Sequence, residues 1–326
     1  MPHKPSFLFL SPREWDERIK QADRIASVCE LCPRRCRVNR LKGEKGFCRA
    51  PAELVISSIF PHHGEEPPIS GKNGSGAVFF SYCTLKCLFC QNYQISHEAA
   101  GETYSPSRLA QKLLDLERSG CHNINLVTPS HFLPWILRAL KEAAAMGLAI
   151  PLDYNNGGYE SPEALRLLKG IEDMYLPDMK YGEPEAAGQL SKAQDYVEVN
   201  RAAIIEMFRQ AGPLLIDKNE IAYRGLCIRH LVLPNGQAHS DSIVKFLAAS
   251  FDPQDLTVSL MAQYRPLFRA REFPEISRAL TPEEYDSVKR LFERAEIGGY
   301  FQEMEKLDGN FCIDFNGRKH EPLTGR

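Results

Sequence analysis

The sequence predicts an α/β fold, built as an open and partial (β/α)6 barrel. From Gly76 onward, six short apolar runs suited to buried strands alternate with stretches whose apolar residues recur at helical spacing. Strands that alternate with helices form a parallel sheet with right-handed crossovers, and six units are two short of a full eight-fold barrel. A doubly wound open sheet is the competing layout, but the sequence lacks the glycine-rich turn that it would need after its first strand.

The predicted strands and helices follow one another in a regular order. The strands are expected at 76–81, 123–127, 148–154, within 171–180, at 226–233 and at 255–262. Helices are expected at 14–25, from the Ser105-Pro106 start to Gly120, at 131–146, from the Ser161-Pro162 start to Gly170, at 196–211, at 239–249 and at 281–296. Three segments follow: an N-terminal cysteine-rich extension (1–75), the barrel core (76–265) and a C-terminal helical or irregular extension (266–326).

Length and composition fit a globular protein with a sizeable core. The chain has 326 residues, of which 43% are hydrophobic and 25% are charged. The formal net charge is only −2. Such a balance gives no electrostatic reason to expect binding to nucleic acid or to an anionic membrane.

The sequence also gives no sign of a membrane segment. No stretch reaches the roughly 20 consecutive apolar residues that a membrane helix needs. The N-terminal run MPHKPSFLFLSPREW has four consecutive apolar residues, which is too short for the core of a signal peptide. We therefore expect a cytoplasmic protein.

Ten cysteines in a cytoplasmic protein indicate metal or redox chemistry rather than disulfides. Seven of them fall in two tight sets. The other three are scattered, and each is predicted to be a small buried apolar residue: Cys121, Cys227 and Cys312.

The segment between Cys48 and the first predicted strand is turn-forming, and 62–76 is predicted to be a linker loop. It holds His62, His63, Glu65 and Glu66, which as a group could bind a metal. They precede the first strand, however, on the side of a barrel that usually serves stability. His131, which follows the second strand, is a stronger functional candidate, and a packed residue at a helix start is the alternative.

Reactive groups of parallel β/α folds gather in the loops that follow the C-terminal ends of the strands. Here those loops are 82–92, TPSH (128–131), NNGG (155–158), DMK (178–180), PNG (234–236) and QYRP (263–266). Most carry polar or ionisable side chains. We expect them to face one mouth of the barrel.

The first of these loops carries three cysteines in a C-x3-C-x2-C pattern; we call them the loop cysteines: Cys83, Cys87 and Cys90. Thiolates suit zinc and iron–sulfur clusters, and a structural zinc site takes four ligands. A four-iron cubane held by three thiolates keeps one iron free for another ligand. A zinc site completed by a distant residue is the alternative.

The motif CTLKCLFCQN, placed after the first strand of a β/α barrel, resembles the radical S-adenosylmethionine (SAM) superfamily. It is most similar to the branch related to pyruvate formate-lyase activating enzyme, and the resemblance spans about 29–261. The resemblance implies a TIM-like barrel of the radical SAM type and a [4Fe–4S] cluster whose free iron binds SAM. Electron transfer to SAM would then give a 5′-deoxyadenosyl radical that abstracts a hydrogen atom. A one-electron donor such as flavodoxin or ferredoxin is also implied.

The resemblance assigns further residues to the cofactor. Phe89 matches the aromatic position beside the adenine. The superfamily's Gly-Gly-Glu stretch, which binds the methionine amino group, is replaced here by VTPSH (127–131). Thr128 and Ser130 are the side chains in that stretch that could accept the same hydrogen bond.

Two later segments also resemble the activating enzymes. Asn155-Asn156-Gly157 resembles their TNG segment after the third strand, which implies cofactor binding, and Asp178-x-Lys180 resembles their Asp-x-Lys after the fourth. Lys180 would present a cation to a carboxylate of SAM or substrate, and Asp178 would help to hold a cation beside SAM. A surface ion pair is the alternative for the last two residues.

The second cysteine set has the pattern C-x2-C-x3-C-x11-C; we call its members the N-terminal cysteines: Cys29, Cys32, Cys36 and Cys48. Four thiolates are the number for a closed site, which predicts bound zinc or a second iron–sulfur cluster. Seven arginines and lysines surround them, and these residues either form a solvated basic loop, offset thiolate charge, or bind an acidic partner or phosphate. The compact pyruvate formate-lyase activating enzyme lacks this set, so the substrate stays open.

Three functions follow from these patterns. The first is a radical SAM enzyme that activates a separate glycyl radical enzyme by taking a hydrogen atom from a backbone glycine. The second is a radical SAM enzyme that modifies a peptide or a small molecule. The third is a non-enzymatic cysteine-rich metal-binding or electron-transfer protein.

Overall fold

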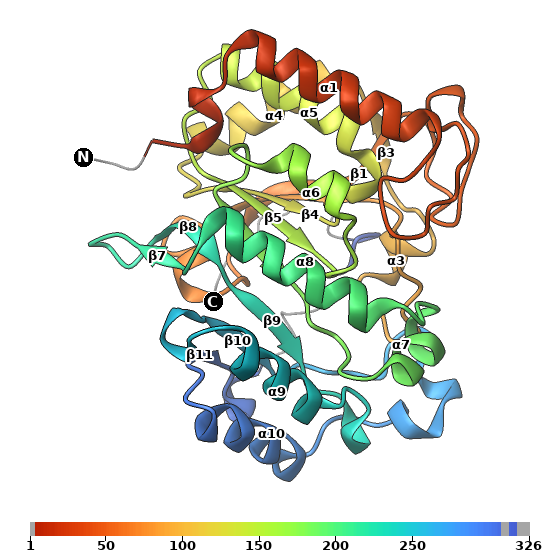
Figure 1. The fold of residues 1–326 in the computed structure, drawn as a ribbon, viewed down its shortest axis with the longest axis vertical. Coiled ribbons are helices and arrows are strands. Elements are labelled where there is room, and N and C mark those ends of the chain that lie inside the picture. The colour runs from red at the N-terminus through yellow and green to blue at the C-terminus, as the bar shows by residue number, and fades with distance from the viewer. Residues whose placement is uncertain (1–3, 308–312, 318–326) are drawn as a thin grey trace.

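The protein is an α/β structure in a computed structural model that describes residues 4–307 and 313–317 (Figure 1). The strands are β1 (Leu54–His62), β2 (Ser75–Phe80), β3 (Glu102–Tyr104), β4 (Ile124–Val127), β5 (Leu152–Asn156), β6 (Met174–Pro177), β7 (Leu215–Ile216), β8 (Ala222–Leu226), β9 (Ile228–Leu231), β10 (Val258–Met261) and β11 (Gly299–Phe301). The helices are α1 (Pro12–Ser27), α2 (Pro67–Ser70), α3 (Tyr93–Ser96), α4 (Pro106–Arg118), α5 (Leu133–Ala145), α6 (Pro162–Leu168), α7 (Pro184–Ser191), α8 (Tyr196–Ala211), α9 (Ser240–Ser250) and α10 (Pro282–Arg294).

The strands form a curved and mostly parallel sheet. Within the described residues, eight strands pair in the order β3-β1-β2-β4-β5-β6-β8-β7, and three more pair in the order β11-β10-β9. A parallel bridge between Asp178, just after β6, and Arg229 in β9 joins the two sheets. The six predicted strands correspond to β2, β4, β5, β6, β9 and β10. No pairing between the β1–β3 side and β11 is present in the part of the chain that the structure describes, so the barrel is open.

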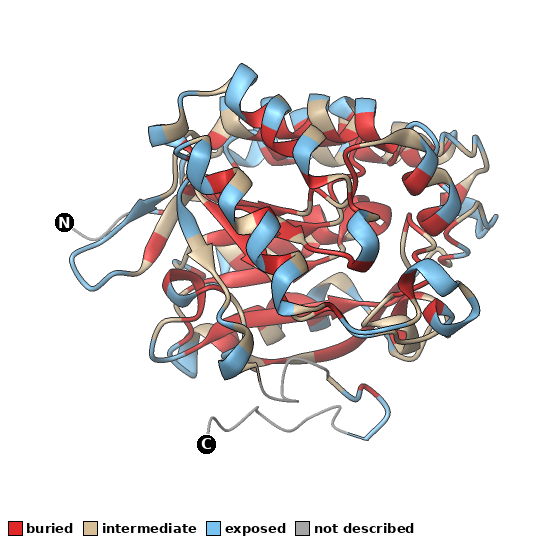
Figure 2. Cartoon of the chain, turned by 90° about the horizontal axis from the view of Figure 1, so that it is seen from below, coloured by how far each residue is buried: buried red, intermediate tan, exposed pale blue. Residues whose placement is uncertain are grey.

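Helices cover the outside of the curved sheet, and their outer faces are exposed while the strands are buried (Figure 2). In α4, Leu109, Leu113 and Leu116 lie on the face turned to the core, as their spacing predicts. Ser105 caps the start of α4 by accepting a hydrogen bond from the Arg108 N–H. The α/β class and the open, partial barrel are therefore as predicted.

The loop predicted at 62–76 is only partly present. Strand β1 runs to His62, α2 is a single helical turn, and β2 already begins at Ser75. Sequence reasoning missed β1, which pairs antiparallel with β2. β1 contains Pro61, but β3 pairs only with its first residues, from Leu54 to Ile56. The missing N–H of Pro61 therefore breaks no pairing with β3.

The N-terminal segment packs against the barrel. Helix α1 begins with a capping box between Ser11 and Glu14 and is two residues longer at each end than predicted. It lies beside α5 (Figure 1), where Asp23 pairs with Arg138 at 2.6 Å. The basic residues in this segment are not all solvated, since Arg40 is fully buried.

Two of the scattered cysteines are buried as expected, with Cys121 3% and Cys227 1% exposed. Cys312 lies outside the described residues. A search of the described residues finds no helix of the length and apolar character that a membrane crossing requires.

Candidate functional site

The loop cysteines follow β2, at the C-terminal end of the parallel strands. Two contacts to the end of α7 hold their loop: the Lys86 N–H donates to the Ser191 carbonyl (3.3 Å) and the Leu88 N–H donates to the Leu190 carbonyl (2.9 Å). On the other side, the Arg269 N–H donates to the Leu88 carbonyl at 3.0 Å. The loop is thus clamped between two separate parts of the chain, which fixes its three sulfur atoms near the barrel mouth.

Each loop cysteine has a hydrogen-bonding partner at its sulfur. The Ser191 hydroxyl donates to Cys87 Sγ at 2.9 Å, Cys90 Sγ lies 3.1 Å from the Ser96 hydroxyl, and the Leu85 N–H donates to Cys83 Sγ at 3.4 Å. Burial raises the pKa of Cys83 to about 12 and that of Cys90 to about 11, and the neighbouring Cys87 adds to both effects. Buried thiols of this kind become thiolates only when a positive group binds them.

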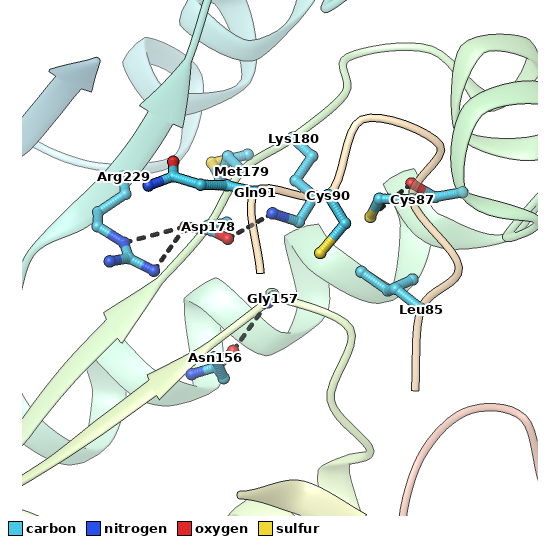
Figure 3. Close-up of polar contacts among 12 residues, drawn as sticks. Leu85, Cys87, Cys90, Gln91, Asn156, Gly157, Asp178, Met179, Lys180 and Arg229 are labelled. Carbon is cyan, nitrogen blue, oxygen red and sulfur yellow. Dashed lines mark hydrogen bonds and ion pairs between the residues drawn. The ribbon is translucent and has the colours of Figure 1, made fainter. Parts of the chain in front are cut away.

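Lys180 and Asp178 lie directly beside the loop cysteines. The Lys180 ammonium is 2.5 Å from one carboxylate oxygen of Asp178, and the Arg229 guanidinium is 2.9 Å from the other. Figure 3 shows the Lys180 ammonium on the side of Asp178 that faces Cys87 and Cys90. The side chains of Lys180 and Asp178 are only 20% and 13% exposed, so this is not the surface ion pair that was the alternative reading.

Asp178 and the two cations Lys180 and Arg229 stabilise one another in their charged forms. Burial alone would raise the pKa of Asp178, but Arg229 and Lys180 hold it below its ordinary value. Burial alone would lower the pKa of Lys180, but Asp178 and Cys87 hold it above its ordinary value. At neutral pH the carboxylate and both cations are therefore charged.

Arg229 extends the network into the barrel interior. Its guanidinium donates to the Asn155 side-chain oxygen at 2.7 Å and to Glu65 at 3.4 Å. The Asn155 amide in turn donates to Glu65 at 3.3 Å. Asn155, which was predicted to bind the cofactor, is therefore part of the same polar group as Asp178.

The loop cysteines fit an iron–sulfur cluster by the chemistry of their donor set. They supply three soft thiol ligands on one short loop, with donors at all three sulfurs and the Lys180 cation beside them. Within the described residues, no group of three His, Cys, Asp or Glu side chains is placed to hold a single metal ion. A four-iron cubane does not need three ligands around one ion, because each thiolate binds a separate iron.

The comparisons with known proteins identify the family. Over 297 residues the chain is 34% identical to the uncharacterized protein MJ0674 of Methanocaldococcus jannaschii, a match that covers 89% of this chain and 81% of the archaeal one. The chain belongs to the MJ0674 family. No family model matches it.

Solved structures with low sequence identity are also similar to this chain. They include a radical SAM methyltransferase from Sphaerobacter thermophilus (TM-score 0.45, 14% identity, 69% of this chain and 65% of that one) and methylornithine synthase PylB (TM-score 0.45, 13% identity, 90% and 72%). Streptococcus suis SuiB, bound to its precursor peptide SuiA, has a TM-score of 0.43 at 11% identity. The chain spans about half of SuiB (46%), with 68% of this chain covered.

In this member of the MJ0674 family, Thr128 and Ser130 have different surroundings. Thr128 is half-buried, has a left-handed backbone conformation (φ 60°) and follows β4 at the barrel mouth. Ser130 is buried, and its hydroxyl donates to Glu160 at 2.5 Å. Within the described residues, Ser130 is therefore bound to a buried carboxylate, whereas the Thr128 side chain is not.

Asn156 and Phe89 are also engaged within the protein. The Asn156 side-chain oxygen accepts the Gly158 N–H at 2.8 Å, and its amide donates to the Tyr154 carbonyl at 3.0 Å. These contacts shape the turn after β5. Phe89 is 7% exposed, and its ring lies 5.8 Å from that of Tyr264. These two aromatic rings pack against each other beside the loop cysteines.

Two other candidates support the backbone. His131 is 1% exposed and forms a 2.8 Å hydrogen bond with the Ser81 carbonyl, directly before the three-cysteine loop. Burial lowers the pKa of His131 to about 3, so the ring is neutral at physiological pH. Asn235 after β9 donates to the Glu275 carbonyl at 2.8 Å and therefore holds a turn.

Sequence reasoning missed two charged residues of the barrel interior. Arg229 and Asp153 lie within strands that were predicted only as buried. Glu65 was a metal-binding candidate on the side of the barrel that usually serves stability, whereas its carboxylate pairs with Arg229 in the barrel interior. Both carboxylate oxygens of Asp153 lack a hydrogen-bond partner, and burial raises its pKa well above the ordinary range. A charged residue inside an apolar strand run is the signal that would have marked Arg229 and Asp153.

Proposed function

We propose that this protein is a radical SAM enzyme, in which the loop cysteines hold a [4Fe–4S] cluster and SAM binds the iron that they leave free. One observation carries the proposal. Three thiols on one short loop, one of them buried and two half-buried, lie beside the charged Lys180–Asp178 pair, at the C-terminal end of an open parallel barrel. Parallel barrels place their reactive groups at that end.

When bound, the cluster and SAM would supply a one-electron cleavage that gives methionine and a 5′-deoxyadenosyl radical, which takes a hydrogen atom from the substrate. The chain's own residues position and shield that chemistry. Ser191 and Ser96 stabilise negative charge on the sulfurs of Cys87 and Cys90 through their hydroxyl groups. Phe89 limits the access of water from its side of the loop.

Lys180 has the role of a fixed cation. Asp178, which Arg229 holds through its other carboxylate oxygen, fixes Lys180 from one side, and the loop cysteines lie on the other (Figure 3). A buried ammonium offsets the negative charge of thiolates and can pair with a carboxylate of SAM or substrate. Thr128 is the half-buried acceptor at the neighbouring strand end.

The test is SAM cleavage in the full-length protein. The chain would be reconstituted with iron and sulfide under anaerobic conditions and reduced, and 5′-deoxyadenosine would be quantified after SAM is added. We expect deoxyadenosine from the wild type and none from Cys87→Ala. Cys121→Ala is a matched control, because Cys121 is buried but distant in sequence from both cysteine sets. A fully loaded, reduced protein that gives no deoxyadenosine would instead support an electron-transfer or metal-binding protein.

We further propose that the substrate is a backbone glycine of a separate glycyl radical enzyme, with flavodoxin or ferredoxin as the electron donor. The resemblance of CTLKCLFCQN to the activating enzymes supports this choice. A glycyl radical signal in the electron paramagnetic resonance (EPR) spectrum of the partner, dependent on this protein and SAM, is the expected result. Deoxyadenosine formed without such a signal, but with a modified peptide or small molecule, would favour that second substrate class.

A further inference from the structure

The N-terminal cysteines lie together in a loop that folds back on itself after α1. The Cys29 N–H donates to the Val38 carbonyl at 2.9 Å, and the Arg37 N–H donates to the Cys29 carbonyl at 3.0 Å. Gly46 lets the chain pass close to Cys36, since a Cβ at Gly46 would lie 2.8 Å from the Cys36 sulfur. Electrostatic interactions connect all four thiols to one another. The loop thus brings four sulfur atoms into one small region.

Backbone N–H groups are directed at three of these sulfurs. The Phe47 N–H donates to Cys36 Sγ at 3.2 Å. The N–H groups of Leu31 and Arg34, two residues further along the chain in each case, form hydrogen bonds with the Cys29 and Cys32 side chains. N–H groups at sulfur stabilise thiolates rather than thiols. A buried loop of neutral thiols would gain little from such donors.

The fourth sulfur faces a buried arginine. Arg40 is 0% exposed, and its guanidinium lies 3.7 Å from Cys48 Sγ and 2.8 Å from the Pro51 carbonyl oxygen. Its Nε has no hydrogen-bond partner, and the described residues offer Arg40 no carboxylate within ion-pair distance. A guanidinium stays charged at any physiological pH, and a buried charge needs an opposite charge nearby. Thiolates are the anions available to Arg40.

We propose that the N-terminal cysteines hold a closed, four-thiolate metal centre whose negative charge Arg40 balances. Four thiolates complete the coordination of one zinc ion or of one four-iron cluster, and both leave an excess negative charge. The side chains are not grouped for a single ion. We therefore expect an iron–sulfur cluster, in which each thiolate binds a separate iron. This inference stands apart from the proposed function, because it does not depend on SAM cleavage.

The centre lies against the three-cysteine loop. The Arg34 guanidinium donates to the carbonyl oxygens of Thr84 (3.0 Å) and Ser191 (3.3 Å), and the Ser191 hydroxyl donates to Cys87. The Lys86 ammonium interacts electrostatically with Cys83 of the loop cysteines and with Cys48 of the N-terminal cysteines. Arg34 therefore links the proposed centre to the loop cysteines, which places two thiolate sites side by side.

The test uses a full-length variant in which all three loop cysteines are alanine, so that iron and zinc report on the N-terminal cysteines alone. After anaerobic reconstitution, we expect about four irons per chain, with an iron–sulfur absorption and EPR signature. About one zinc per chain would support a four-thiolate centre but overturn the expectation of a cluster. A folded variant that holds neither metal would overturn the proposal. The readout is independent of activity, because this variant also lacks the cysteines required for SAM cleavage.

Arg40 is tested in the same background. Arg40→Met should lower the metal content of the N-terminal cysteines at least several-fold, whereas Arg40→Lys should retain most of it. Arg37→Met is the matched control, since the Arg37 side chain lies in the same loop but is 74% exposed. Full metal retention in a folded Arg40→Met variant would overturn the role of Arg40. If Arg40→Met does not fold, Arg40→Lys still decides, because metal loss in that folded variant would contradict a role based on charge.

Discussion

Lys180 and Asp178 form a buried ion pair in which the ammonium lies 2.5 Å from one carboxylate oxygen, while Arg229 binds the other oxygen at 2.9 Å. The pair comes from one stretch of chain after β6, and Arg229 comes from β9. One carboxylate thus holds two cations, of which only Lys180 faces the loop cysteines (Figure 3). This arrangement gives the site one fixed positive charge directed at the proposed cluster.

Replacing Lys180 with methionine should impair SAM cleavage. Methionine keeps an unbranched side chain but removes the cation, and a hydrogen bond from a charged group contributes about 1.5–3 kcal/mol. We expect deoxyadenosine formation at limiting SAM to fall about 10- to 100-fold, chiefly through a higher KM for SAM. Lys245→Met serves as the control, because its side chain is 79% exposed and pairs with the exposed Asp241. Unchanged kinetics in Lys180→Met would remove Lys180 from the site.

Replacing Asp178 with asparagine should destabilise the protein. The change leaves Lys180 without the carboxylate of Asp178, and Glu65 is then the ion-pair partner of Arg229 that remains among the described residues. Breaking a buried ion pair by removing one partner costs about 3–5 kcal/mol, whereas an exposed pair contributes less than about 1 kcal/mol. We expect a clearly lower Tm than that of the wild type for Asp178→Asn, measured by circular dichroism. The control Asp241→Asn should have almost the same Tm as the wild type. Equal shifts in both variants would show that the Asp178 network adds no stability.

Periodic patterns and caps predicted most of the elements of this fold. The six barrel strands and α4 were expected because apolar spacing and an N-cap serine are local signals. The positions of polar side chains within the site depended on long-range contacts instead. Asn156 turns toward its own backbone, and Arg229 reaches Asp178 and Glu65 from another strand. Neither orientation follows from a residue's place along the chain.

Ser191→Ala should lower the reduction potential of the cluster that we propose on the loop cysteines. The Ser191 hydroxyl donates to Cys87 Sγ at 2.9 Å, and such a bond stabilises the more negative, reduced state. A hydrogen bond of about 1 kcal/mol corresponds to a change of roughly 40 mV for a one-electron couple. Potentiometric titration followed by EPR would measure it. Ser242→Ala, which removes a hydroxyl bonded to Glu183, should leave the potential unchanged, and the same value for both variants would refute this role of Ser191.

Glu160 should make stability depend on pH near neutrality. Its carboxyl group is buried and accepts hydrogen bonds from Ser130 (2.5 Å) and Tyr154 (3.1 Å). Burial raises the pKa of Glu160 to about 7, above its ordinary value near 4.5. The folded state therefore binds a proton that the unfolded state has already lost between about pH 4.5 and 7. This contribution to stability is full below pH 4.5 and is lost as the pH rises through 7.

The variant Glu160→Gln isolates this effect, because glutamine resembles the neutral carboxylic acid. The wild-type free energy of unfolding should fall relative to that of Glu160→Gln as the pH rises from about 5 to 7, with a slope that approaches about 1.4 kcal/mol per pH unit for one proton, and should level off by about pH 8. Glu163→Gln is the control, since the Glu163 side chain is 40% exposed and lies near Glu160 in sequence. A constant difference between wild type and Glu160→Gln across this range would mean that Glu160 is ionised in the folded protein throughout. In that case Ser130 and Tyr154 would stabilise a buried carboxylate rather than a carboxylic acid.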